Sequence, residues 1–413
     1  MSEAYALEMD AKDPLGRFRE RFLLPEGVYM LGNSLGPLSR DAEAAVTRVV
    51  GEWRRKGVGG WFEAEPPWLG LAERVGAMAS GIMGAEPEEV VATGSTTVNI
   101  HALASAFYRP EGRRRKILAD ELNFPSDLYA LAGQIRQRGG DPAEDLVLVP
   151  SSDGRTIDEQ RVVSMMTDEI ALVHLPSVLY RSAQLLDVGC LARAAAERGI
   201  HFGLDCSHSA GVVEHRLDEW GVDYAVWCGY KYLCSGPGGS AFLYLARRHF
   251  DLEPLMPGWF GFVRERQFDM LPGFEHERSA GGFQISSPGI LGIAPLEASL
   301  GMILEAGIRS IRDKSVGLTS FLVDLVDGRL SHLGFRVGSP RDPSRRGGHV
   351  AVETARACEV HDALAERGVI VDFRPPDVIR IAPSPLFNTW HEVWRIVEHL
   401  LEIGQQSLSP PSG

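Results

Sequence analysis

The sequence predicts an α/β protein that is built around a mostly parallel β-sheet and carries a smaller C-terminal domain. A chain of 413 residues is long enough for two or three domains of roughly 100–200 residues each. Short apolar runs alternate with segments of helical period in the middle of the chain, as they do where helices connect parallel strands. Unusual polar residues follow several of these runs, and ligands of such sheets bind at the carboxyl ends of the strands.

The apolar runs and the segments between them predict the elements in order. The predicted strands span residues 89–94, 116–120, 145–150, 170–176, 200–205, 224–229 and 240–245, and two of the helices span residues 98–108 and 188–199. Residues 291–330 have a long helical period and lead into four short segments, FRVGS, GGHVAVE, GVIVDFR and VIRIAPSPL. We therefore expect an N-terminal arm that joins the small domain (1–60), a large domain (61–290) and a small α+β domain (291–413) with a disordered tail, SLSPPSG.

Composition and charge exclude several classes of function. A net charge of −13 argues against a nucleic-acid partner, which favours a basic face. No apolar run reaches the roughly 18 residues that span a bilayer, so we expect no membrane association. The acidic N-terminus lacks the features of a signal peptide, and we predict a cytoplasmic protein.

The cysteines and histidines predict neither a disulfide framework nor a metal site. The chain has five cysteines, an odd number, and no CxxC pair. The segment HEVWR at 391–395 begins like a metalloprotease helix, but Arg395 stands where the second histidine is needed. We interpret the cysteines as small, mostly buried apolar residues.

Lys231 is the first candidate for chemistry. It lies in DYAVWCGYKYLCSGPGGSAFLY (223–244), between an apolar run and a glycine-rich turn, in a chain that has only four other lysines and uses arginine for most of its positive charge. Burial beside apolar groups lowers the pKa of a lysine, and the uncharged amine is a nucleophile that forms Schiff bases. The alternative is a lysine with a buried stem and a solvated amine, which is the commoner case for an isolated lysine.

Asp205 and His208 follow the predicted strand at 200–205. A carboxylate at the end of a strand can hold a protonated pyridine nitrogen, as the ring of pyridoxal phosphate (PLP) requires. Asp205 precedes Lys231 by 26 residues, about one crossover and one strand, so both are expected on the same rim of the sheet. The alternative is that Asp205 only caps a helix.

A phosphate site is predicted where ATGSTTVNIHAL (92–103) turns from strand to helix. Ser95, Thr96 and Thr97 offer hydroxyls, and the start of a helix offers free N–H groups. In NFPSD (123–127), Phe124 could stack on a flat ring, or simply belong to the core. The joint order of phosphate turn, aromatic residue, aspartate and lysine favours a PLP enzyme.

At this point the sequence resembles the kynureninase family, fold-type I PLP hydrolases of the aminotransferase class V superfamily. The matching segments are YMLGNSLGPLSR (29–40), TVNIHALASAFYRP (97–110), FPSDLYAL (124–131), LDCSHSAGVVEHRLDEWGVDYAVWCGYKYLCSGPGG (204–239), PGWFGF (257–262) and VIRIAPSPLFNT (378–389). These segments extend from the N-terminal arm to the small domain. The resemblance implies the fold-type I large domain and hydrolytic Cβ–Cγ cleavage of a kynurenine to alanine and an anthranilate.

The resemblance also implies roles for individual residues. Lys231 would carry PLP as a Schiff base and move protons, and Tyr230 would bond the phosphate and serve in proton transfer. The other implied cofactor contacts are Thr96, Thr97, Phe124, Asp127, Asp205, His208, Trp259 and Ser287. The implied substrate contacts are Arg380, which would clamp the α-carboxylate, and Asn33, Ser34, Trp61, Phe262 and Ser287. A homodimer is implied, with Trp259 reaching the active site of the partner subunit.

The chain departs from the family pattern at several positions. Phe262 stands where a histidine is usual, and Ser287 stands where animal enzymes have asparagine. Pro176 replaces a hydroxyl residue that binds phosphate, and Ser177 is the nearest substitute. We expect Trp61, Phe262 and Ser287 to line the pocket for the aryl ring. The hypothesis is a preference for a ring-substituted kynurenine from a biosynthetic pathway, and the alternative is neutral drift.

Three other functions are compatible with parts of the pattern. A cysteine desulfurase or selenocysteine lyase would need a mobile cysteine in the small domain, where the chain offers only Cys358 in a helix-like segment. An aminotransferase of the same fold would convert PLP to its amine form. A non-catalytic binding protein on this scaffold is disfavoured because Lys231, Asp205 and Arg380 are all present.

Overall fold

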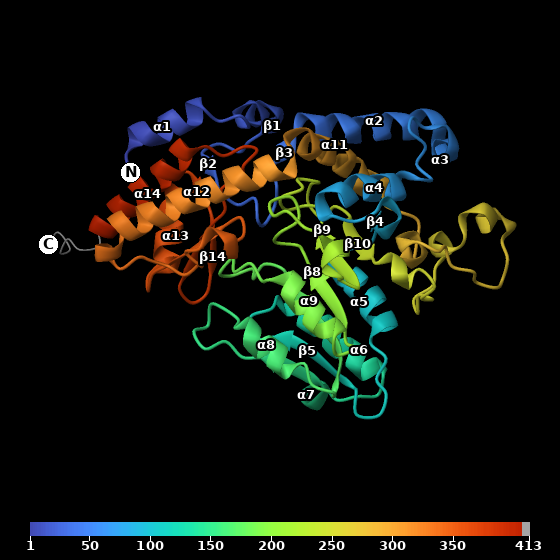
Figure 1. Ribbon diagram of the computed structural model, residues 1–413. Helices are drawn as coiled ribbons and strands as arrows, with labels where there is room; N and C mark the ends of the chain where they lie inside the picture. The colour runs from blue at the N-terminus through green and yellow to red at the C-terminus, as the bar shows by residue number, and fades with distance from the viewer. Residues whose placement is uncertain (407–413) are drawn as a thin grey trace.

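A seven-stranded sheet forms the centre of the computed structural model, which describes residues 1–406 (Figure 1). The strand order is β4-β10-β9-β8-β7-β5-β6, and only β10 runs antiparallel to its neighbours. The strands are β4 (Val90–Ala92), β5 (Lys116–Asp120), β6 (Leu146–Val149), β7 (Ile170–Pro176), β8 (His201–Asp205), β9 (Tyr224–Cys228) and β10 (Ala241–Leu245). All seven predicted strands are confirmed to within two residues at each end.

Helices cover both faces of this sheet. They are α4 (Leu71–Met83), α5 (Thr96–Phe107), α6 (Pro125–Gln137), α7 (Pro142–Asp145), α8 (Glu159–Met165), α9 (Val188–Ala196) and α10 (Leu217–Trp220). Because crossovers between parallel strands are right-handed, α5 and α6 lie on one face and α8, α9 and α10 on the other. Every residue of β7, β9 and β10 is buried, as expected for a sheet that is covered on both sides.

A second, smaller sheet lies at the C-terminal end of the chain, in orange and red in Figure 1. Its antiparallel order is β11 (Arg336–Val337), β12 (Val350–Glu353), β15 (Val378–Ile381) and β14 (Asp372–Arg374). Helices α12 (Ile308–Arg329), α13 (Ala357–Glu366) and α14 (Trp390–Gln406) belong to this part. The N-terminal arm joins it: α1 (Glu3–Ala11) packs on α14, and β2 (Val28–Tyr29) pairs with β13 (Val369–Ile370).

The long helical segment predicted at 291–330 is two helices. Gly307, with φ of 79°, ends α11 (Ile290–Ala306) and begins α12 at a bend of 79°. Helix α11 packs against α2 (Arg40–Lys56) and contributes apolar side chains to the core of the large sheet, whereas α12 contributes to the core of the small one. The predicted domain limits stay a prediction, and the predicted disorder of 407–413 lies outside the described residues.

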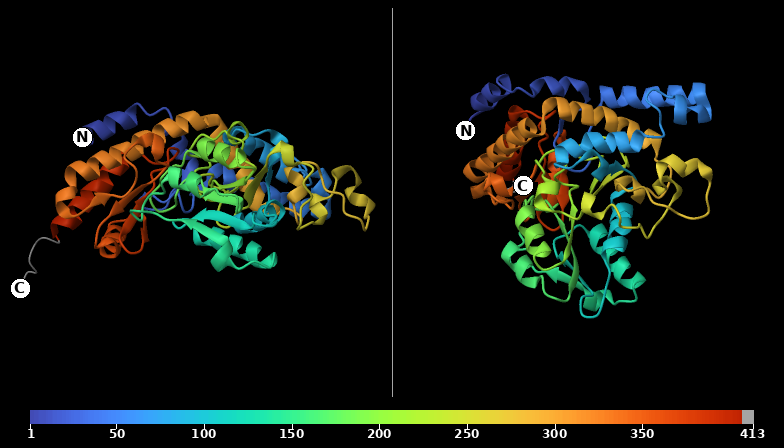
Figure 2. Two further views of the ribbon diagram at one scale, coloured as in Figure 1. Left: turned by 60° about the horizontal axis from the view of Figure 1, so that its bottom comes forward. Right: turned by 45° about the vertical axis from the view of Figure 1, so that its right-hand side comes forward.

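The end of the molecule away from the small sheet carries helix α3 (Gly60–Glu63) and an excursion at 251–289. Both views of Figure 2 show this excursion, in yellow and gold, projecting from the body. Within the described residues no single helix is long and apolar enough to cross a bilayer; only α11 and α12 taken together, bent as they are, pass by length and composition.

Candidate active site

Lys231 lies in the turn after β9, and its amine contacts His208. The Nζ of Lys231 is 3.0 Å from the Nε2 of His208, in the segment that follows β8. The turn GNSLG packs over this loop, because the Gly36 amide donates to the Tyr230 carbonyl at 2.8 Å. A Cβ at Gly36 would lie 2.5 Å from the Lys231 carbonyl oxygen, so only glycine fits there.

Asp205 and Asp127 lie together near Lys231; the sequence predicted Asp205 and Lys231 on one rim of the sheet, and the family resemblance implied a role for Asp127. Asp205 ends β8, and Asp127 is in the first turn of α6. Burial raises the pKa of Asp127 to about 7, although the Asp205 and Lys231 side chains oppose the rise. Burial, reinforced by Asp127, raises the pKa of Asp205 to about 6. The two carboxyls therefore attract a cation or a proton between them.

His208 is held neutral. Burial, followed by the charges of Lys231 and Arg380, lowers the pKa of His208 well below its usual range. Its Nδ1 is buried and has no hydrogen-bond partner among residues 1–406. A neutral ring next to the lysine can accept a proton or a hydrogen bond from the amine, or bind a polar group of a ligand.

The turn before α5 has the features of a phosphate site. Ser95 precedes the helix, whose first turn holds Thr96 and Thr97. The Thr96 hydroxyl is buried without a partner in the described part of the chain, and the Ser95 side chain makes no capping hydrogen bond. The first N–H groups of this helix are free to bind an anion.

Ser177 and Tyr230 are the hydroxyl-bearing residues next to Pro176 and Lys231 in the sequence, and their surroundings differ. Ser177 forms a hydrogen bond with Ser209, whose hydroxyl also lies 2.9 Å from His215 Nε2. Ser177 therefore belongs to a buried chain of hydrogen bonds with Ser209 and His215.

Burial and the neighbouring Cys228 raise the pKa of Tyr230 above the ordinary value for a phenol. Tyr230 is therefore protonated and can donate a hydrogen bond.

Phe124 directly precedes α6 and is partly exposed. It is 40% exposed, and its ring meets that of Tyr180 edge-on at a centroid distance of 5.3 Å. Tyr180 in turn lies 6.4 Å from the His208 ring. Phe124 therefore belongs to the Lys231 cluster rather than to the core, in keeping with a ring that stacks on a flat ligand.

Arg380 lies in the middle of β15 and is 1% exposed. Its Nε donates to the carboxylate of Asp372 at 2.7 Å, and its Nη2 donates to the same carboxylate. Its Nη1 donates to the Tyr180 carbonyl at 2.8 Å. The two-pronged edge expected to clamp a substrate carboxylate thus faces Asp372, because the protein must neutralise a buried guanidinium. The other N–H of each terminal nitrogen remains for a ligand.

The GNSLG turn brings Asn33 and Ser34 beside the strand of Arg380. Leu31 forms a bridge with Ala382, immediately after β15. Asn33 is fully buried, and neither atom of its side-chain amide has a hydrogen-bond partner in residues 1–406. Such an amide is poised to bind a polar ligand.

A separate pocket contains three of the predicted site residues, Trp61, Trp259 and Ser287. They line a pocket of about 230 Å³ together with Val58, Phe62, Leu69, Phe260 and Phe268. None of these residues belongs to the Lys231 cluster, and α3 lies at the end of the molecule away from the small sheet (Figure 1). The Trp259 indole N–H donates to the Gln267 carbonyl at 3.0 Å within its own chain.

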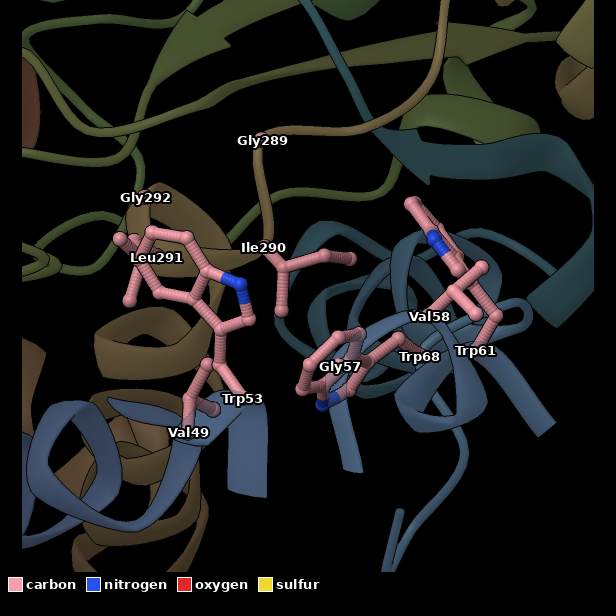
Figure 3. A pocket seen from close by; sticks show the side chains of 10 residues that line it. All are labelled: Val49, Trp53, Gly57, Val58, Trp61, Trp68, Gly289, Ile290, Leu291 and Gly292. Atoms are coloured by element: carbon pink, nitrogen blue, oxygen red, sulfur yellow. The ribbon is translucent and has the colours of Figure 1, made fainter. Parts of the chain in front are cut away.

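Phe262 does not line this pocket. Its side chain is buried, 6.2 Å from the ring of Phe274. A second apolar pocket of about 450 Å³ adjoins the first, and Trp61 borders both. Figure 3 shows Trp53, Trp61, Trp68 and Leu291 around the larger pocket, half of whose lining residues belong to α2 and the start of α11.

One cluster with metal-ligand chemistry occurs among the described residues, although no metal site was predicted. The ligand atoms of His201, Asp223 and His249 lie within 4.8 Å of one another. Asp223 already accepts hydrogen bonds from Arg248 at 2.9 Å and from the Phe202 amide at 2.7 Å. The cluster is at the start of β8 and β9, the opposite edge of the sheet from Asp205 and Lys231.

Sequence reasoning missed three residues that shape the site. Asp372 holds Arg380, Tyr180 connects Arg380 with Phe124, and His174 lies 3.5 Å from Asp127. The signal for His174 is a histidine in the otherwise apolar run IALVHLP. Asp372 and Tyr180 carry no such signal, because their importance comes from contacts between distant segments.

These residues fit PLP. Lys231 supplies the amine, Asp205 and Asp127 supply acids for a ring nitrogen, and the unpartnered Thr96 hydroxyl marks an anion site at a helix start. Together with a mixed, mostly parallel seven-stranded sheet and a small C-terminal domain, they define a PLP-dependent enzyme of fold type I.

Solved structures share this fold. An apo cysteine desulfurase from Thermococcus onnurineus NA1 matches with a TM-score of 0.82 and 19% identity, over 95% of this chain and 98% of that one. The cystine C–S lyase C-DES in complex with cysteine persulfide matches with a TM-score of 0.81 and 16% identity, over 92% and 98%. Likenesses at these identities show the shared fold alone.

Sequence relatives define the family. The kynureninase of Geobacillus thermodenitrificans is 48% identical over 403 residues, which cover 97% of this chain and 94% of the relative. The kynureninase of Bacillus anthracis is 48% identical over 400 residues, with the same coverage. The model of the kynureninase C-terminal domain matches residues 311–400. The chain belongs to the kynureninase family of PLP-dependent enzymes.

Proposed function

We propose that the protein hydrolyses the Cβ–Cγ bond of L-kynurenine, or of a ring-substituted kynurenine, to L-alanine and the matching anthranilate. The observation that carries this proposal is the cluster of Lys231, His208 and Asp205 in a chain 48% identical to kynureninases over 97% of its length. The reaction consumes one water. Its oxygen becomes part of the anthranilate carboxylate, and the β-carbon of alanine gains a proton.

Lys231 would remove the α-proton of the substrate and return protons later in the cycle. The cofactor, which Lys231 would hold until the substrate amine takes its place, would supply a conjugated ring that withdraws the electron pair released at carbon. Neutral His208, 3.0 Å from the amine, is positioned to accept a hydrogen bond from it. Protonated Tyr230 can donate a proton in the half of the cycle that follows bond cleavage, a contribution of roughly 10²–10⁴-fold in rate.

The remaining cofactor contacts hold the ring and the phosphate. Asp205 and Asp127 would keep the ring nitrogen protonated, because a cation between two buried carboxyls relieves their repulsion. Thr96, Thr97 and the start of α5 would bind the phosphate, and Phe124 would stack on the ring.

Arg380 would orient the substrate through its α-carboxylate. The N–H groups left on its terminal nitrogens are enough for two parallel hydrogen bonds, and Asp372 fixes the plane of the guanidinium. Asn33 and Ser34, beside the same strand, would add polar contacts to the substrate.

A homodimer would complete the site. The pocket of Trp61, Trp259 and Ser287 is apart from Lys231 in one chain, and the surface around it exposes Trp53, Val58, Phe62, Met270 and Leu291. An apolar surface of this kind marks an interface between proteins. A second copy that covers it would place its own Trp259 and Ser287 next to the Lys231 cluster of the first.

The ring of the substrate would lie in the aromatic pocket. Its walls are Trp61, Phe62, Trp259, Phe260 and Phe268, and a volume of about 230 Å³ leaves room for a ring substituent. An almost wholly apolar lining supports methyl- or halogen-substituted kynurenines as substrates. Ser287 is the polar side chain on the pocket wall.

Steady-state assays with PLP test the proposal. Anthranilate fluorescence would be followed with kynurenine, 3-hydroxykynurenine and ring-methylated or halogenated kynurenines, and alanine would be measured in parallel. We expect equal amounts of alanine and the anthranilate. No cleavage of any kynurenine would contradict the proposed reaction, and a higher kcat/KM for unsubstituted kynurenine than for every analogue would contradict the ring preference.

A further inference from the structure

His174 lies directly behind the acid pair of the site. It is fully buried in β7, an otherwise apolar strand. Its Nε2 is 3.5 Å from the Oδ2 of Asp127, at the outer limit of a hydrogen bond. Neither atom has a hydrogen-bond partner within residues 1–406, and buried polar atoms without one are costly. A small movement of either side chain would give each atom the other as its partner.

Tyr224 holds the other side of the His174 ring. Its hydroxyl is 3.1 Å from the Nδ1 of His174, and the two rings are stacked at a centroid distance of 5.8 Å. Gly203, on the neighbouring strand β8, makes room for this tyrosine, since a Cβ there would lie 2.1 Å from the tyrosine ring. Tyr224 is fully buried, so this arrangement is fixed by packing.

The protonation states of Tyr224 and His174 limit which atoms can donate in the hydrogen bonds around His174. Burial, then the charges of Asp223 and Asp127, raises the pKa of the Tyr224 phenol, so Tyr224 keeps its proton. Burial lowers the pKa of His174 to about 4, against the opposing charge of Asp205, so the ring carries a single proton at neutral pH. A hydroxyl can donate or accept, whereas a carboxylate only accepts, so the tautomer that satisfies both neighbours has its proton on Nε2, towards Asp127, and accepts from Tyr224 at Nδ1.

We propose that His174, oriented by Tyr224, is a positioning residue that donates from Nε2 to Asp127 and so stabilises the ionised form of this carboxylate and directs it at Asp205 and the ring nitrogen of PLP. The inference rests on the proposed cofactor role of Asp127, but not on kynurenine being the substrate. A carboxylate that loses a donor in a buried site takes up a proton more easily and holds a cation less well.

PLP binding to the apoprotein tests this inference without any turnover. His174→Phe should raise the Kd for PLP at least about tenfold, the effect of losing a hydrogen bond to a charged group. His174→Gln keeps a donor for Asp127 and should stay within about threefold of wild type. Tyr224→Phe should give a value between these two, because the histidine remains but its proton is no longer directed.

Tyr244→Phe is the matched control. Tyr244 is also fully buried, on the adjacent strand β10, and its hydroxyl has no partner in the described part of the chain. Its loss should leave the Kd for PLP unchanged. A His174→Phe variant that binds PLP as tightly as wild type overturns the inference. If that variant does not fold, a Tyr224→Phe variant that matches Tyr244→Phe overturns it instead.

The tautomer of His174 gives a second measurement. Imidazole ¹⁵N NMR of the apoprotein, with the signal assigned by its loss in His174→Gln, should show the proton on Nε2 at neutral pH. A proton on Nδ1 contradicts the inference. So does a lower melting temperature in the His174 variants without a change in PLP affinity, because that result marks a residue that serves packing alone.

Discussion

Burial controls the chemistry of individual residues in this site. Lys231, Asp205 and His208 could be predicted from sequence because each follows an apolar run, and polar residues in that position gather at one rim of a parallel sheet. Their ionisation could not be predicted. The pKa values of Asp127, Asp205 and His208 depend on which groups surround them after folding, and those groups come from different parts of the chain.

The raised pKa of Asp127 predicts a pH dependence of stability in the apoprotein. The folded-state pKa of about 7 is above the unfolded value, so the folded state binds the proton more tightly. This contribution to the free energy of unfolding is present at low pH and is lost as the pH rises from about 4 to about 7. It amounts to up to about 1.4 kcal/mol for each unit by which the folded and unfolded pKa values of Asp127 differ.

Asp127→Asn should remove that contribution. We expect the variant to lose less stability than wild type between pH 5 and pH 7.5, measured as the change in free energy of unfolding by urea without PLP. Using the difference between the two proteins cancels the titration of groups that Asp127 does not affect; Asp205, whose pKa Asp127 raises, changes in the same direction and adds to the difference. Parallel stability curves for the two proteins would show that Asp127 titrates normally.

At the scale of elements, the start of α5 is a second place where sequence and structure agree. The predicted strand, small-residue turn and helix are present, and the Thr96 hydroxyl lacks a partner among residues 1–406. Thr96→Val should raise the Kd for PLP by about 3–10-fold, the usual effect of one hydrogen bond. Ser105→Ala is the control on the same helix, since the Ser105 hydroxyl donates to the Ala102 carbonyl of that helix, and it should leave the Kd unchanged.

The GNSLG turn gives a prediction about packing. Gly36→Ala should destabilise the protein by about 1–3 kcal/mol and weaken PLP binding, because the added methyl group would overlap Cys234 and the Lys231 carbonyl. Gly328→Ala is the matched change in open space near the end of α12, where it should be neutral or stabilise by up to about 1 kcal/mol. Thermal unfolding of the two holoproteins measures the difference; equal melting temperatures would contradict the close approach.

Two elements show where periodicity stops being informative. The strands could be located because their apolar runs are short and end at polar or glycine residues. The segment 291–330 reads as one helix, although Gly307 divides it between two cores. The bend of 79° could not be predicted from this one glycine, because it depends on the surfaces against which the two helices pack.

At the scale of the whole molecule, the candidate site is in two parts. Lys231 contacts His208 in the turn after β9, whereas Trp61, Trp259 and Ser287 line a pocket with residues of α3 and of the excursion at 251–289. If a homodimer brings these parts together, an intact site needs Lys231 from one subunit and Trp259 from the other.

Mixed dimers test this arrangement. Lys231→Ala and Trp259→Ala should each be almost inactive alone, and co-refolding them at equal amounts should restore about a quarter of the wild-type activity, since random pairing gives that share of intact sites. Co-refolded mixtures of wild type with each variant control for recovery. No restored activity would show that both residues act within one subunit, or that no dimer forms, and light scattering separates these two outcomes.

The sequence alone determined the strands of the large sheet, the order of the chemical groups along it and the resemblance to a family, because these depend on local patterns of apolar, polar and glycine residues. Only the tertiary structure decided that Arg380 faces Asp372, that Phe262 is buried away from the aromatic pocket, and that His174 faces Asp127. Those outcomes depend on contacts between segments far apart in the chain, and no local pattern encodes which of them will meet.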